Sequence, residues 1–134
     1  VLAIDTRHNY AKRAPGTTAD HQWLTSSTLS GAGWTEPARV TDPSGGWVGG
    51  YEGTTAPDGS YVVIYGKRNP WRSVAVWSVT YADGAWSKAR IVAPSRTAAN
   101  GSTGVWLAPP VAAPSGRVTA AWVVDDKVFA SSSG

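Results

Sequence analysis

The chain has no cysteine, no methionine and only one phenylalanine among its 134 residues. Without cysteine it can form neither a disulfide nor a thiolate metal site, so packing alone must hold its core. No apolar run is long enough to span a membrane, and none follows a basic start as in a signal peptide. Because position 1 is valine, we expect a processed product or a piece of a longer protein.

Helix-forming segments are also scarce. The 15 glycines and 9 prolines are spread along the chain, and no window of 12 residues keeps a helical period without a breaker. Valine, threonine, tryptophan and tyrosine are plentiful instead, which favours β structure. The clearest strands are 61–65, 72–81 and 118–124, and each is apolar on both faces. We therefore expect an all-β protein whose main strands are covered on both sides.

Two pairs of segments repeat in the same order. GWTEPARV (33–40) matches AWSKARIV (85–92) at a separation of 52 residues, and APDGSYVVIY (56–65) matches APSGRVTAAW (113–122) at 57. Each period holds four short strands: an inner one (47–53, 105–113), a second (60–66, 117–124), a third (72–81, 127–131) and an outer one (34–40, 86–92). Four antiparallel strands in roughly 40–50 residues are typical of a propeller blade.

The order of strands predicts about two and a half such blades. Residues 1–6 take the place of a second strand, 21–28 that of a third, and the C-terminal strand that of a third with no outer strand after it. We interpret 1–134 as a single β-repeat domain, part of a larger or oligomeric propeller, whose terminal strands pair with another chain or with further copies. A β-sandwich is the alternative, since short strands with glycine-rich turns fit it too.

The outer-strand motif DGAWSKARIVAP (83–94) resembles the β-propeller repeats of secreted actinobacterial proteins, which are similar to lectin-like and sialidase-like propellers. The resemblance extends from residue 22 onward and implies a secreted, extracellular protein. The sequence departs from the sialidase Asp-box, S-x-D-x-G-x-T-W. YADGAW (81–86) lacks the leading serine and the spacing between Asp83 and Gly84, so the resemblance does not imply sialidase activity.

One end of the predicted strands is rich in cations. In a meander of strands the connections alternate between two ends, so the segments 7–20, 41–46, 66–72 and 93–104 share one end. Of the 12 basic residues, Arg7, Lys12, Arg13, Lys67, Arg68 and Arg72 lie at this end, and KRNPWR (67–72) holds three of these six. The ligand-binding residues that this pattern predicts are Arg7, Tyr10, Lys12, Arg13, Trp47, Lys67, Arg68, Trp71, Arg72 and Trp106.

The chemistry of these residues predicts a binding function. Tryptophan and tyrosine stack on sugar rings, and arginine binds phosphate or carboxylate groups through two hydrogen bonds. We therefore expect a noncatalytic module that recognises a glycan or an anionic surface polymer, and nucleic acid is not favoured. The remaining repeat and mid-strand tryptophans, Trp34, Trp77, Trp86 and Trp122, are predicted to lie in the core.

Catalytic patterns are few. His8 and His21 are the only histidines and have no closely spaced ligands, so neither a metal nor another cofactor is expected. Asp42, Glu52 and Asp125 could belong to a glycosidase carboxylate pair if their strand ends converge, although turns explain them more simply. Two alternatives to the binding module stay open: a fragment of a glycan-acting propeller enzyme, and an assembly subunit in which KRNPWR contacts another protein.

Overall fold

The computed structural model describes residues 1–9, 21–42, 47–69, 73–97 and 105–133. The ordered elements of these residues are all strands, which confirms the all-β expectation. Across the same residues no helix is long and apolar enough to cross a membrane. The chain divides into two compact units, residues 1–48 and residues 49–134.

The first unit is one antiparallel sheet, called sheet 1. Its strands are β1 (Leu2–Asn9), β2 (His21–Ser30), β3 (Gly33–Trp34) and β4 (Ala38–Arg39). β1 pairs with one edge of β2, while β3 and β4 both pair with its other edge. The outer strand predicted at 34–40 is thus two short pieces, with Pro37, which has no backbone donor, directly before the second piece.

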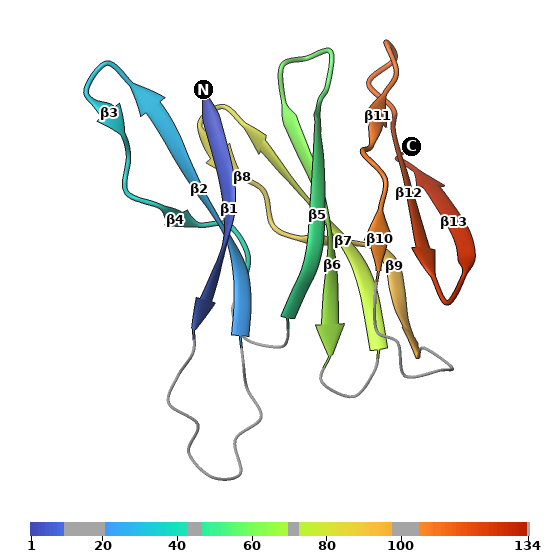
Figure 1. Cartoon of the computed structure of the whole chain (residues 1–134). Coiled ribbons are helices and arrows are strands. Elements are labelled where there is room, and N and C mark those ends of the chain that lie inside the picture. The colour runs from blue at the N-terminus through green and yellow to red at the C-terminus, as the bar shows by residue number, and fades with distance from the viewer. Residues whose placement is uncertain (10–20, 43–46, 70–72, 98–104, 134) are drawn as a thin grey trace, which may run out of the picture. The chain divides into compact units, whose positions relative to one another are not determined.

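The second unit has two antiparallel sheets (Figure 1). Sheet 2 consists of β5 (Trp47–Thr55), β6 (Tyr61–Asn69), β7 (Ser73–Ala82), β8 (Ala85–Trp86) and β9 (Arg90–Thr97). Sheet 3 consists of β10 (Trp106–Leu107), β11 (Val111–Ala112), β12 (Val118–Val124) and β13 (Lys127–Ser132). The predicted succession of inner, second, third and outer strands is confirmed in sheet 2 as far as its described residues go. Three antiparallel sheets of about four strands each are therefore established, and their closure into a propeller remains a prediction.

Hydrogen bonds confirm the APDG/APSG repeat. The Ala56 amide donates to the Ser60 carbonyl at 2.8 Å, and the Gly59 amide donates to the Ala56 carbonyl at 2.9 Å. The same two bonds, with the same lengths, recur 57 residues later between Ala113 and Arg117 and between Gly116 and Ala113. Both glycines have φ of 83°, a left-handed conformation that other residues rarely adopt.

The outer strands repeat in the same detail. The Thr35 amide donates to the Thr28 carbonyl at 3.0 Å, and the Thr28 amide donates back to the Thr35 hydroxyl at 3.0 Å. In sheet 2 the Ser87 amide donates to the Thr80 carbonyl at 2.8 Å, and the Thr80 amide donates to the Ser87 hydroxyl at 3.0 Å. A hydroxyl residue directly after the tryptophan therefore attaches the outer strand to the third strand in both sheets.

Sheets 2 and 3 pack face to face through one apolar cluster. Its buried members are Ile64, Val74 and Val76 from sheet 2, Ala120, Trp122 and Val124 from sheet 3, and Val105. The indole of Trp122 stacks on Phe129 of the neighbouring strand, with ring centroids 6.2 Å apart. Val105 lies directly against Gly66, because a Cβ atom on Gly66 would overlap the Val105 Cγ1 atom. The absence of a side chain at residue 66 thus permits the close approach of the two sheets.

The expectation of burial on both faces is confirmed for sheet 2 but not for β12. The second face of sheet 2 holds Val63, Tyr65 and Val79, which are at most 2 % exposed. In β12, by contrast, buried residues alternate with exposed or half-buried ones from Val118 to Val124. The prediction that both faces of 118–124 are covered is therefore wrong, because one face of sheet 3 is open. The residues on this face of β12 are mostly apolar, so the sequence did not distinguish it from a covered face.

The tryptophan predictions have mixed outcomes. Trp122 is buried as expected, and Trp77 and Trp86 are half-buried. Trp34 is 53 % exposed, so its assignment to the core is wrong. It lies in the two-residue strand β3, which pairs with the end of β2 at Leu29, itself 44 % exposed.

Acidic residues occupy the tight turns, as predicted. Asp125 and Asp126 have φ of 50° and 58° between Val124 and Lys127, which is the geometry of a two-residue hairpin turn. In the APDG turn, the Asp58 carboxylate accepts hydrogen bonds from the Ser60 hydroxyl at 2.7 Å and the Ser60 amide at 2.9 Å. The hydroxyl bond first, and then the amide bond, lower the pKa of Asp58 below its ordinary value.

We expect Gly66→Ala to destabilise the protein by about 1–3 kcal/mol, because the added methyl group would force Val105 out of its packed position. The measurement is the free energy of unfolding in denaturant. Gly50→Ala is the matched control in the same sheet, since the nearest atom to its Cβ is the Val105 carbonyl oxygen at 4.0 Å. Equal effects of the two substitutions would contradict this account of the packing.

We expect Ser60→Ala to raise the pKa of Asp58 toward its ordinary value, because the variant loses the hydroxyl donor and keeps only the amide. A lowered pKa in the folded state stabilises the protein above the unfolded pKa of about 3.9, and this stabilisation is lost as pH falls through the folded value. NMR titration of the Asp58 carboxyl carbon measures the shift. An unchanged midpoint in the variant would show that the hydroxyl bond is absent in solution.

Candidate functional site

Two of the predicted cations lie at the end of β6. Lys67 and Arg68 are consecutive and half-buried, so their side chains point to opposite faces of sheet 2. The Lys67 ammonium lies 6.0 Å from the centroid of the Trp77 ring, within the range of a cation–π interaction. The Arg68 side chain runs along β5, where its Cδ atom is 3.3 Å from the position of a Cβ on Gly49.

The strand register adds a third cation to this end. Arg68 pairs with Val74 on β7, and Val74 pairs with Arg96 on β9. By their backbone register, positions 68, 74 and 96 therefore form one row across three neighbouring strands, and positions 68 and 96 are about 10 Å apart. Arg96 is not among the predicted binding residues, although residues 93–104 are predicted to lie at this end as a connection, and β9 in fact continues to Thr97.

The remaining residues of the predicted site are described only in part. Arg7 is placed by its backbone, opposite Trp23 in the β1–β2 pair, and Trp47 begins β5. The other predicted residues lie outside the described part of the chain: Tyr10, Lys12, Arg13, Trp71 and Arg72. Their proposed role in binding therefore stays a prediction.

Trp106 is described and is 76 % exposed. It follows the buried Val105 and pairs with Val123, so its indole lies on the open face of sheet 3. Val105 points the other way, toward Gly66 and Gly49. The structure thus places Trp106 on the far side of β10 from Arg68 and does not bring the two side chains together.

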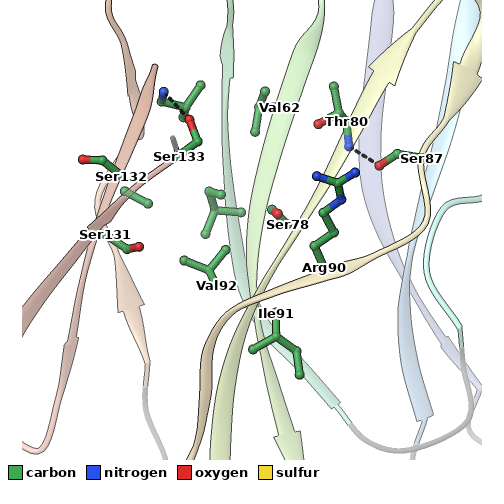
Figure 2. A pocket seen from close by; sticks show the side chains of 13 residues that line it. Val62, Ser78, Thr80, Ser87, Arg90, Ile91, Val92, Ser131, Ser132 and Ser133 are labelled. Carbon is green, nitrogen blue, oxygen red and sulfur yellow. Dashed lines mark hydrogen bonds between the residues drawn. The ribbon is translucent and has the colours of Figure 1, made fainter. Parts of the chain in front are cut away.

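A hollow in the second unit lies elsewhere, between the outer parts of sheets 2 and 3 (Figure 2). Its volume is about 430 Å³. Ser131, Ser132 and Ser133 of the C-terminal segment form one wall. The opposite wall includes Ser87, Arg90, Ile91 and Val92. Its lining combines aliphatic side chains with six serine or threonine residues and one arginine, Arg90.

Small side chains create this hollow. In sheet 2 the residues paired with Tyr61 and Val63 are Tyr81 and Val79. The matching residues of sheet 3, 57 positions later, are Val118 and Ala120. They lie opposite Ser133 and Ser131 on β13. The run of three serines at 131–133 was the available sequence signal, but the hollow depends on how two separate sheets face each other.

The first unit has a shallow groove of its own on the open face of sheet 1. Asp5, Glu36 and the exposed Trp34 line one part of it, with a volume of about 420 Å³. An adjoining part is lined by Trp23 and Arg39, whose guanidinium carbon lies 5.2 Å from the Trp23 ring centroid. The sequence analysis missed this groove because it assigned Trp34 to the core.

The carboxylates considered for catalysis lie in different parts of the fold. Asp42 is exposed at the end of the first unit, Glu52 lies within β5, and Asp125 is in the β12–β13 turn. Within the described ranges, no group of three histidine or acidic side chains could hold a metal ion.

Comparison with known proteins gives no further guide to the site, because no family model, curated protein or solved structure matches this chain. Its function must therefore be argued from the geometry of its own residues.

Proposed function

We propose that the protein is a noncatalytic binding module for a carbohydrate or an anionic surface polymer. The observation that supports this most directly is the row of Arg68 and Arg96 at one end of sheet 2, with Lys67 beside it on the other face. Cations at several neighbouring strand ends suit a polymer that carries carboxylate, sulfate or phosphate groups at regular intervals, because several weak contacts add along one chain.

The surroundings of these cations also favour recognition of an extended ligand. Lys67 and Arg68 are only half-exposed, so their aliphatic parts are already ordered against Trp77 and β5, which lowers the entropy lost on binding. Two of the predicted binding residues outside the described part of the chain, Trp71 and Arg72, follow Arg68 in the sequence after only Asn69 and Pro70. We place the ligand contact at this end and extend it to those residues.

Replacing Arg68 or Arg96 with glutamine should weaken binding to a sulfated polysaccharide by about 0.5–1 kcal/mol each, because each change removes one positive charge from this end of sheet 2. Each variant should also show a weaker dependence of affinity on salt than the wild-type protein does. Binding is measured by calorimetry at low and high salt, with an uncharged polysaccharide as a second ligand.

Arg117→Gln is the matched control, because Arg117 is an exposed arginine in the APSG turn at the opposite end of the same unit. It should leave both the affinity and the salt dependence unchanged. A loss of affinity as large as that of Arg68→Gln would show that binding follows net charge, and the proposed contact surface would then be wrong.

A second candidate function is assembly with further copies, which the open face of sheet 3 favours. Gly66 and Val76 pair in sheet 2, on the face that sheet 3 covers. The internal repeat aligns Gly66 with Val123 of sheet 3, which pairs with Val128. Val76 is 2 % exposed, whereas Val128 is 76 % exposed. Trp106 and Val111 are exposed on the same open face, at 76 % and 67 %. Such an apolar face suits contact with another sheet.

If this face joins copies, the wild-type protein should have a solution mass above 14.0 kDa that rises with concentration. Val128→Lys should shift the mass toward that of the monomer without unfolding the protein, because the side chain is already exposed. Sedimentation equilibrium measures both. A well-folded wild-type monomer at all concentrations would rule out assembly through this face.

A further inference from the structure

The outer edge of β13 is the one place in the second unit where the internal repeat indicates a strand that the described residues do not supply. β7, the third strand of sheet 2, pairs with β6 on one side and with β8 and β9 on the other. β13 is the third strand of sheet 3, and within the described part of the chain it pairs with β12 alone.

The 57-residue repeat shows which residue of β13 corresponds to the point where the outer strand attaches in sheet 2. Thr80, which holds the outer strand of sheet 2, pairs with Val62, and the residue 57 positions after Val62 is Thr119. Thr119 pairs with Ser132. Ser132 therefore stands where Thr80 stands in sheet 2, and it is the position at which an outer strand would begin.

The backbone of β13 has the right orientation for this pairing. The Ser133 amide donates to the Val118 carbonyl at 2.9 Å, so Ser133 directs its backbone groups toward β12. Because these groups alternate along an antiparallel strand, Ser132 and Ala130 direct theirs to the outer edge. Both residues are also exposed.

The hollow of Figure 2 lies beside this edge and has the form needed by the tryptophan of an outer strand. In sheet 2, Trp86 packs on Tyr81 with ring centroids 5.2 Å apart. In sheet 3, Ser133 takes the place of Tyr81 and leaves space between itself and the wall formed by Ile91 and Val92. Ile91, 57 % exposed, is an apolar surface that an indole would cover.

We propose that the outer edge of β13 binds an extended segment with the pattern of this chain's own outer strands, a tryptophan followed by serine or threonine and then by A-R-[IV]. The segment pairs with Ala130 and Ser132 through its backbone, and its tryptophan enters the hollow beside Ser133. Backbone pairing supplies affinity that any sequence could share, and the hollow supplies the preference for tryptophan. This inference does not depend on polymer binding at the cationic end.

The test uses the whole chain and a fluorescent synthetic peptide with the sequence of residues 83–93, DGAWSKARIVA. We expect saturable binding by fluorescence anisotropy and a rise in the melting temperature of the protein. Hydrogen exchange at the Ala130 and Ser132 amides should slow at least tenfold at saturation, because these amides become bonded to the peptide. The control is the same peptide with serine in place of tryptophan, which should bind at least tenfold more weakly.

A protein variant provides an independent arm. Ala130→Pro removes an amide that points to the outer edge, where proline is tolerated in strands, so the fold should persist while peptide binding is lost. Ala130→Val keeps the amide and should bind normally. If Ala130→Pro does not fold, the two peptides still decide the question on the wild-type protein.

Three results would overturn the proposal: equal binding of the tryptophan and serine peptides, unchanged exchange at Ala130 and Ser132 with saturating peptide, or exchange protection of these amides that depends on protein concentration without peptide. The last result would show that the edge pairs with the edge of a second copy instead.

Discussion

The contact between Val105 and Gly66 is the constraint on which the second unit depends. Sheets 2 and 3 pack through a cluster of aliphatic side chains and one indole, and their closest approach occurs where residue 66 has no side chain. Any larger residue there would separate the sheets and loosen contacts along the whole interface, since protein interiors are packed too densely to absorb an added methyl group. The neighbouring Lys67 and Arg68 follow Gly66 on the same strand, where Lys67 contacts Trp77 and Arg68 lies against Gly49.

The internal repeat explains the regularity of the structure and also shows where sheet 3 differs from sheet 2. Identical hydrogen bonds close the APDG and APSG turns, and hydroxyl groups attach the outer strands of sheets 1 and 2. Where the repeat is interrupted in sheet 3, the described chain has an open strand edge, an exposed apolar face and a hydroxyl-lined hollow. Exposed edges and faces of this kind are costly for an isolated soluble domain, which favours a role in contacts with other chains.

The proposed functions use different parts of the second unit. Cations gather at the end of the sheet where β6 ends and β7 begins, while the hollow lies nearer the opposite turns. A charged polymer and a strand-forming segment could therefore be bound together without competing for the same residues. The acidic Asp125–Asp126 turn belongs to neither surface, and its left-handed backbone accounts for its residues without a binding role.

The sequence by itself determined the all-β class, the strand order and the repeat, because these follow from local residue patterns and from turn residues such as Asp58-Gly59. It also indicated Lys67 and Arg68 as candidate binding cations, but in a connection, whereas both lie within β6. Only the tertiary structure decided which faces are covered. The open face of β12, the exposure of Trp34, the row of Arg68 and Arg96 and the hollow at Ser133 all depend on how strands distant in sequence pair and pack. Hydrophobic alternation identifies a strand, but it does not say whether another sheet lies above it.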